Sequence, residues 1–359
     1  MADILQQTYA PKLSPAIADM ETARLQDYVL KNKILDSDYK FYSLFIIGIY
    51  SAYLMTLYFV ANSSNYFVIV LFSIFFGIIA TQIAGLMHDA AHLAMFKSQK
   101  MNHLFADLFA TTIGSNYRHW IDKHTQHHDH PNHIDSDSDL EVPFSFTTEH
   151  YLSQTGYMKW LRRYQVWVYL PMCGFLMYAI QYNQHIIQLY KRKFHVLDLL
   201  ICCSSIFLWY VMPFLLFGVT KAIVFIPIAS FITGIYMANI FATNHKGMPQ
   251  LSKDTEMSNL EQQIITTRNV RPGILTDFIY LCLNYQIEHH LYRQCPRNKL
   301  KLLVPYIKDF CQRTGIPYTI QTPWQAYKSI FTDLSQTAKK GQKALKGEMS
   351  NSGRKGQEI

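Results

Sequence analysis

Four long apolar stretches divide this chain of 359 residues, and each is long enough to cross a lipid bilayer as a helix, which takes about 20 residues. A fifth apolar stretch, residues 166–182, is shorter and contains Pro171, Gly174 and Gln181. The pattern predicts an all-α integral membrane protein with four transmembrane helices. Their expected positions are residues 41–61, 66–87, 198–217 and 222–243.

The positive charges give the expected orientation of these helices. The connection at residues 62–65 contains no Lys or Arg, and the connection between the third and fourth stretches contains only Lys221. The other basic residues lie outside the stretches, in segments that would share the side of the N-terminus. Because cytoplasmic loops carry an excess of Lys and Arg, we predict two helical hairpins whose open ends face the cytoplasm.

Composition adds a polar part to this picture. Half of the residues are apolar and 16% are charged, against about a quarter in soluble proteins. The mean hydropathy of +0.01 is too low for a chain made of membrane spans alone. We expect a cytoplasmic segment at residues 1–40 without a secretory signal, a membrane domain at 41–325, and a polar, basic tail at 326–359. The tail is rich in Lys, Gly, Ser and Gln from Ser335 onward, and we expect it to be disordered.

The histidines are grouped at the cytoplasmic ends of these stretches. On a helix, residues three or four positions apart share one face, so each group can present its imidazoles together. The groups, here called boxes, are box 1 (His88 and His92), box 2 (His124, His127 and His128) and box 3 (Gln286, His289 and His290), with His245 at the end of the fourth stretch.

The fifth apolar stretch decides whether these boxes can meet. If residues 166–182 crossed the bilayer, box 2 and box 3 would face opposite sides of it. We therefore expect this stretch to be an interfacial or re-entrant helix, and the boxes to form a helical cap on the cytoplasmic side.

Eight imidazoles from separated segments are too many ligands for one metal ion and suit two. Imidazole binds Fe, Zn, Cu and Ni, so the residue types leave the metal open. A metal-bound His donates its second N–H to a carboxylate or carbonyl. Acidic residues near the boxes are candidates for that role: Asp89, Asp129, Asp135, Asp137, Asp139 and Glu288. The remaining histidines show no such spacing, and we expect them at the surface or in packing.

Together these motifs resemble the membrane fatty-acid desaturases. The boxes match H-D-x-x-H, H-x-x-H-H and Q-x-x-H-H, and residues 124–139 and 283–291 are similar to the family around them. The Gln form of box 3 is similar to front-end acyl and sphingolipid desaturases. The resemblance extends over residues 40–325.

The resemblance implies two iron ions held by His88, His92, His124, His127, His128, His245, His289 and His290. Gln286 stands where other family members have His, and its ligation stays open. Asn244 is implied to lie close to the metals. No residues are implied to be catalytic beyond the ligands.

The resemblance also implies an O2-dependent desaturase that inserts a cis double bond into a fatty acyl chain, carried on a lipid or on CoA. The sequence contains no His-Pro-Gly-Gly haem motif, so electrons are expected from a separate ferredoxin or cytochrome b5. On the same ground we expect a bacterial inner membrane rather than the endoplasmic reticulum.

Two alternatives remain at this stage. A di-iron alkane or fatty-acid hydroxylase would use the same metals and insert oxygen. A membrane haem electron carrier or metal transporter would place its histidines within the spans, whereas here they lie at the ends. Nothing in the sequence points to a nucleic-acid partner.

Overall fold

The computed structural model describes residues 10–134, 136–140, 144–191, 195–252 and 255–355. Four helical segments within this part are long and apolar enough to cross a membrane. They are α2 (Tyr39–Asn62), α3 (Tyr66–Ala91), the run of α11 (Val196–Ile206), η5 (Phe207–Val211) and α12 (Met212–Phe217), and α13 (Val219–His245). The predicted spans are thus confirmed to within a few residues at each end.

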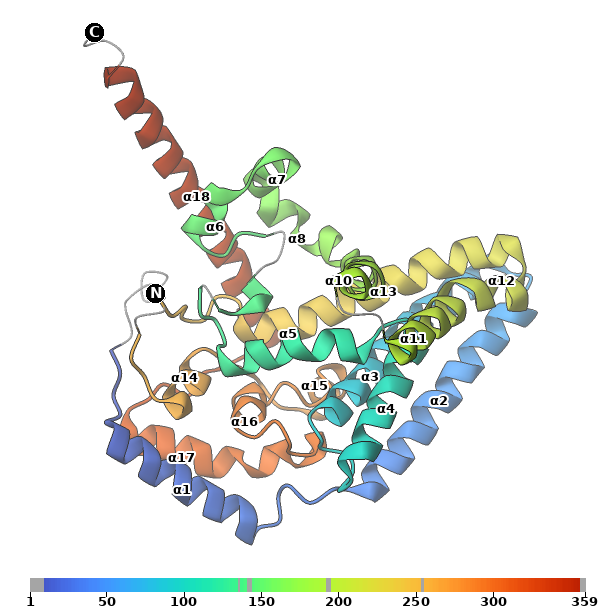
Figure 1. Ribbon diagram of the computed structural model, residues 1–359, viewed down its shortest axis with the longest axis horizontal. Coiled ribbons are helices and arrows are strands. Elements are labelled where there is room, and N and C mark those ends of the chain that lie inside the picture. The colour runs from blue at the N-terminus through green and yellow to red at the C-terminus, as the bar shows by residue number, and fades with distance from the viewer. Residues whose placement is uncertain (1–9, 135, 141–143, 192–194, 253–254, 356–359) are drawn as a thin grey trace.

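The four segments form two hairpins that pack against each other (Figure 1). At the short connections, Lys221 donates from Nζ to the carbonyl oxygen of Ala61 at 2.6 Å, which joins the two hairpin tips. Helices α3 and α13 approach closely at Gly77, where an added Cβ would lie 2.7 Å from Cβ of Ile232. The two helices run in the same direction, so the C-terminal ends that carry His88 and His245 lie at the same end of the bundle.

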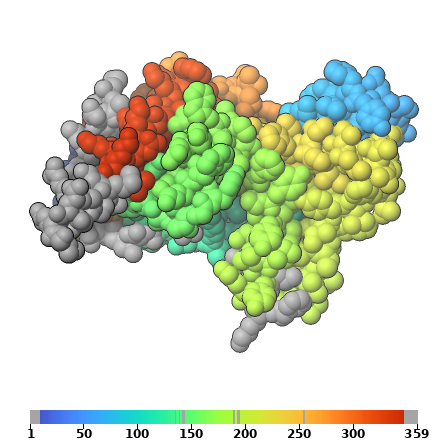
Figure 2. Space-filling view, turned by 90° about the horizontal axis from the view of Figure 1, so that it is seen from above, coloured from blue at the N-terminus to red at the C-terminus, as the bar shows by residue number. Residues whose placement is uncertain are grey.

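The fifth apolar stretch forms two short helices, α8 (Gln165–Cys173) and α9 (Leu176–Tyr182), that lie along α13. The break at Gly174 is a point of close approach, because a Cβ added at Gly234 of α13 would lie 2.6 Å from the Gly174 carbonyl oxygen. Trp167 is 82% exposed, and the yellow-green segment that follows this stretch projects from the body of the molecule in Figure 2. Its interfacial or re-entrant placement stays a prediction.

Most of the other elements form a cap at the end of the bundle where the histidines lie, whereas α4 (Gln99–Thr112) packs along α3 (Figure 1). One parallel pair of two-residue strands, β1 (Asn269–Val270) and β2 (Ile320–Gln321), interrupts an otherwise helical structure. The longer helices outside the spans are α1 (Pro15–Lys31), α4 (Gln99–Thr112), α5 (Tyr117–Asp129), α17 (Val304–Thr314) and α18 (Pro323–Lys355). The shorter ones are η2 (Ser138–Leu140), α6 (Thr148–Ser153), α7 (Gly156–Leu161), η3 (Arg162–Tyr164), η4 (Asn183–Ile187), α10 (Gln188–Lys191), α14 (Asn259–Ile265), α15 (Ile274–Ile279), α16 (Gln286–Leu291) and η6 (Arg297–Leu302).

The C-terminal tail differs from the prediction. Helix α18 extends to Lys355, where we expected disorder from Ser335 onward. Leu334, Thr337 and Ala338 are buried, and Tyr151 of α6 packs directly against Gly341. The prediction is therefore wrong for residues 335–341, because an apolar stripe at helical spacing outweighs the polar composition of this segment.

Candidate metal centre

Box 1 is positioned by the end of α3. His88 lies in its last turn and His92 directly follows it, and both side chains are buried. The helix stops here because Leu93 takes the left-handed conformation, with φ of 61°, and the Ala94 N–H bonds back to the Asp89 carbonyl oxygen. The ring centroids of His88 and His92 are 4.5 Å apart, so the expected shared face is present.

Box 2 lies on α5, whose first turn is capped by Asn116. The Asn116 side chain accepts hydrogen bonds from the backbone N–H groups of Arg118 and His119, which fixes the start of the helix. His124, His127 and His128 are all buried. Trp120 stacks on the ring of His124 with centroids 4.1 Å apart and covers that side of the site.

Box 3 occupies the short helix α16, and His245 is the last residue of α13. The structure brings these residues together with boxes 1 and 2, although they are far apart in sequence. Two groups result. The first cluster is His88, His92, His124, His128 and His289, and the second cluster is His127, His245 and His290.

Within each cluster, the nitrogens that could bind metal lie within 4.8 Å of one another. Nε2 of His124 is 2.9 Å from Nε2 of His92 and 3.1 Å from Nε2 of His128. Two imidazole nitrogens bound at right angles to one ion at about 2.1 Å would be about 3 Å apart. The first cluster therefore fits a metal ion.

The protonation states also suit metal binding. Burial, reinforced by the neighbouring imidazoles, lowers the pKa of His92, His124 and His128 well below the usual value. The same causes lower the pKa of His289 and His290. These rings are thus neutral at pH 7, which is the form that binds metal.

His127 is the exception among the box residues. Burial lowers its pKa, but the carboxylates of Asp139 and Asp137 outweigh that effect and the pKa is raised overall. Nδ1 of His127 lies 2.9 Å from Oδ1 of Asp137. Asp137 in turn accepts hydrogen bonds from the backbone N–H groups of Asn132 and Asp139, at 2.7 and 2.8 Å. This arrangement leaves Nε2 of His127 to face the second cluster.

The other acidic candidates take different positions. Glu288 accepts hydrogen bonds from the Tyr318 hydroxyl at 2.5 Å and from Nδ2 of Asn269 at 2.8 Å, which fixes α16 to the strand pair. Burial raises the pKa of its carboxyl group. Asp129 pairs with Arg293 at the surface, 3.5 Å away. Asp135 lies outside the described residues.

Gln263 of α14 was not found from the sequence. Its Oε1 lies 2.8 Å from Nδ1 of His290, and its Nε2 donates to the His128 carbonyl oxygen, also at 2.8 Å. Gln263 thus joins box 2 to box 3. It lies between Gln262 and two isoleucines in a short amphipathic segment, where the sequence contains no signal for this contact.

Gln286 and Asn244 lie beside the second cluster. Nε2 of Gln286 is 3.0 Å from Nε2 of His245, and Oε1 of Gln286 accepts from Nδ2 of Asn244 at 3.0 Å. The same Asn244 nitrogen also donates to the Leu283 carbonyl oxygen. Gln286 therefore lies beside His245 of the second cluster, with its amide nitrogen facing that ring.

The histidines that we assigned to packing include buried, hydrogen-bonded residues away from both clusters. Nδ1 of His119 lies 2.5 Å from the Gln184 carbonyl oxygen, and Nε2 of His185 lies 2.8 Å from that of Gly114. His103 bonds the Tyr117 hydroxyl at 2.8 Å. These contacts agree with a packing role.

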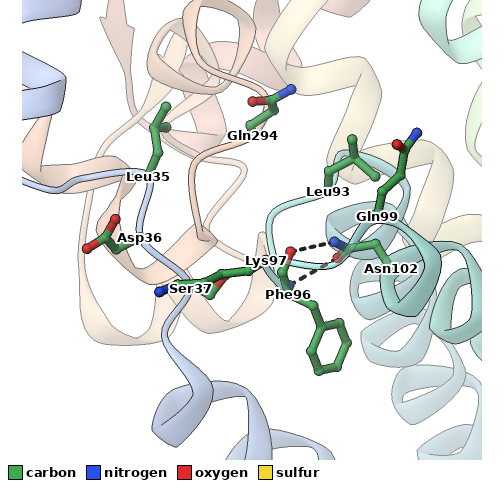
Figure 3. Close-up of a pocket in the computed structure, with 9 residues that line it drawn as sticks. All are labelled: Leu35, Asp36, Ser37, Leu93, Phe96, Lys97, Gln99, Asn102 and Gln294. Carbon is green, nitrogen blue, oxygen red and sulfur yellow. Dashed lines mark hydrogen bonds between the residues drawn. The ribbon is translucent and has the colours of Figure 1, made fainter.

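A cavity of about 250 Å³ opens beside box 1. Figure 3 shows that it is lined by three segments: residues 35–37, the loop and helix start after His92, and Gln294, which follows box 3. Asn102 closes one side through hydrogen bonds with the backbone of Phe96. None of the residues that line this cavity is a histidine.

Comparison with known proteins decides the family. Residues 64–322 match the family model described as fatty acid desaturase. The chain belongs to the fatty acid desaturase family. The match includes α3, the second hairpin and every residue of box 1, box 2 and box 3, whereas α2 lies before it.

Three relatives of this desaturase family member illustrate the likeness. A fatty acid desaturase 2-like protein of Mus musculus is 27% identical over 284 residues, which are 77% of this chain and 57% of the relative. A Delta(5) fatty acid desaturase of Caenorhabditis elegans is 28% identical, over 69% of this chain and 59% of the relative. A Delta(8)-fatty-acid desaturase of Euglena gracilis is 25% identical, over 79% and 72%. The chain thus spans slightly less than three fifths of the first two relatives.

Proposed function

We propose that this protein is an O2-dependent di-iron desaturase that inserts a cis double bond into a fatty acyl chain, with electrons from a separate ferredoxin or cytochrome b5. The observation that carries the proposal is the pair of buried imidazole clusters at the end of the membrane bundle. The family match and the names of the relatives support the acyl substrate.

The proposed ligands are the eight imidazoles of the two clusters, with Gln286 as a possible ninth group. Iron held there would supply the oxidising power that removal of hydrogen from an unactivated C–H bond requires. In the overall reaction, two neighbouring CH2 groups lose one hydrogen atom each. One O2 molecule accepts these two hydrogen atoms, two electrons from the donor and two protons, and gives two water molecules.

The chain's own residues have three tasks in this proposal. The first is to keep the imidazoles away from solvent and, except at His127, neutral; all eight are buried, at 3–7% exposure. The second is to orient individual rings, through Asp137 at His127 and Gln263 at His290. The third is to hold the acyl chain between the hairpins and the cap, so that chosen carbons face the clusters.

We propose that the centre faces the cytoplasm, because the hairpin tips contain a single basic residue, Lys221, whereas the cap is rich in them. A bacterial inner membrane stays a prediction. The di-iron hydroxylase remains the alternative, since it would need the same ligands.

Lipid profiling of expressing cells tests the proposal. We expect a new acyl species two hydrogens lighter than its precursor, absent from cells that express His128→Ala. His103→Ala is the matched control, because His103 lies outside both clusters, and it should give the same species as the unchanged protein. A product that has gained one oxygen would show that the protein is a hydroxylase and not a desaturase.

A further inference from the structure

A buried arginine joins the segment after box 3 to the aspartate within box 1. Arg297, the first residue of η6, is 3% exposed, and Asp89 directly follows His88 on α3. Nε of Arg297 donates to Oδ2 of Asp89 at 2.5 Å. The two residues are 208 positions apart in the chain, so this contact fixes the third box segment against the first.

Tyr42 of α2 completes the arrangement. Its hydroxyl donates to the same oxygen, Oδ2 of Asp89, at 2.8 Å, and accepts from the backbone N–H of Arg297 at 3.4 Å. Two donors thus hold Oδ2. The other oxygen, Oδ1, faces Nδ1 of His88 at 3.6 Å.

His88 needs such an acceptor if it binds metal, because a metal-bound imidazole keeps its geometry through a hydrogen bond from its second nitrogen. Nδ1 of His88 is buried and has no hydrogen-bond partner in the described part of the chain. Oδ1 of Asp89 is the carboxylate oxygen that faces it, and a small rotation of either side chain would bring the two into hydrogen-bond distance.

Packing fixes the position of the guanidinium group. A Cβ added at Gly85 would lie 2.8 Å from Nη2 and 3.0 Å from Nη1 of Arg297, so the glycine makes room for the arginine. Both opposite charges are buried, Arg297 at 3% and Asp89 at 5% exposure. Removing one partner of such a buried pair leaves an uncompensated charge, whereas replacing both can be nearly neutral.

We propose that Arg297 is a positioning residue for the metal centre: through Asp89 it sets the orientation of the His88 ring and locks box 1 to the segment that follows box 3. The inference rests on the proposed metal centre and adds to it a residue outside the boxes. Within the described residues, neither Nη atom of Arg297 has a hydrogen-bond partner, so Arg297 acts on His88 through Asp89.

The test compares purified variants loaded with Co²⁺ as a spectroscopic probe and, separately, with Fe²⁺. Arg297→Lys keeps the charge and one donor, and Arg297→Met with Asp89→Leu removes both charges so that no lone charge stays buried. Arg162→Met is the matched control. Arg162 is equally buried but bonds the backbone of Tyr151 and Leu152, away from both clusters.

We expect the double variant to bind metal about 10- to 100-fold more weakly and to show a shifted visible Co²⁺ band, with Arg297→Lys intermediate. Arg162→Met should keep the affinity and band of the unchanged protein. The inference is overturned if a folded double variant retains that affinity and band. If the unchanged protein binds no metal, the proposed function fails instead, so the two failures are distinguishable.

Discussion

The membrane-spanning helices and the cap supply the same centre in different ways. The spans provide His88 and His245 from helix ends, and His92 directly after α3, within a bundle held by apolar packing. The cap provides the other five imidazoles from the short helices α5 and α16. Its buried polar groups, such as Asp137, Glu288 and Gln263, hold those helices in place.

Each cluster contains imidazoles from both regions. The first cluster combines box 1 from α3 with residues of boxes 2 and 3, and the second combines His245 of α13 with His127 and His290. Metal ions bound there would therefore tie the cap to the bundle. We infer that the bundle sets where the centre lies, whereas polar contacts in the cap set its geometry.

The largest expected effect comes from removing a cap ligand at the middle of the first cluster. His124→Ala deletes the ring whose Nε2 faces both His92 and His128. We expect desaturated product to fall at least about 100-fold, because loss of an outer partner alone costs 10- to 100-fold. Iron per chain and product should be measured together. Wild-type iron content in this variant would contradict the assignment of His124 as a ligand.

Metal removal should destabilise the cap more than the membrane-spanning bundle. A ligand at about 1,000 times its Kd stabilises the folded state by about 4 kcal/mol, so chelation should lower the unfolding midpoint. Hydrogen exchange should rise in α5 and α16 and stay unchanged in the middle of α2. Equal increases in both regions would show that the centre does not join them.

Gln263→Met tests the polar support of the cap at similar side-chain size. It removes the acceptor for Nδ1 of His290 and the donor to the His128 carbonyl oxygen. We expect Fe²⁺ affinity to fall about 10-fold in a metal titration. Gln262→Met is the control, since Gln262 bonds the carbonyl oxygen of Asp129 rather than a box histidine, and its affinity should stay unchanged.

Gly77→Ala tests the bundle instead. The added methyl group would lie within 3 Å of Ile232 and of the Ala229 carbonyl oxygen, and overpacking of this kind costs about 1–3 kcal/mol. We expect a lower unfolding midpoint together with unchanged metal affinity at a temperature where the variant is folded. A large loss of affinity would mean that the bundle also sets the geometry of the centre.

The smallest effect concerns pH and lies in the cap. Burial raises the pKa of Asp333 from 3.8 to about 6, even though Lys246, Arg268 and Lys340 favour its charged form. The folded state therefore binds a proton more tightly than the unfolded state, and stability is lost as pH rises from about 4 to about 6. Asp333→Asn should remove this dependence and stabilise the protein by up to about 3 kcal/mol at pH 7. Unfolding midpoints between pH 4 and 7.5 measure it, and an unchanged slope would contradict it.

The sequence predicted the bundle well because a bilayer imposes a simple length and polarity rule. The span expected at residues 66–87 is α3, Tyr66–Ala91, and the helical spacing of boxes 1, 2 and 3 correctly placed their residues on shared faces. The sidedness inferred from the Lys and Arg residues stays a prediction. Those signals are local, so they are visible without a fold.

Contacts between distant segments could not be predicted in this way. Arg297 meets Asp89, and Gln263 meets His290, only after the cap has folded. In the sequence, several acidic residues near box 2 are equivalent candidates for the partner of a metal-binding histidine. Only the fold shows that Asp137 is the partner of His127, held in place by the backbone N–H of Asn132. For α18, by contrast, a signal was present: Ala326, Ile330, Leu334 and Ala338 recur every four residues and are buried. The polar composition around them led to the wrong prediction.

The number of iron ions per chain tests whether the two clusters form a di-iron centre. Protein purified in detergent from iron-replete cells should contain about two iron ions per polypeptide, and His128→Ala, which alters only the first cluster, should contain less. A folded protein that contains no iron after such growth, or that retains full iron content without His128, would contradict a di-iron centre at the two clusters.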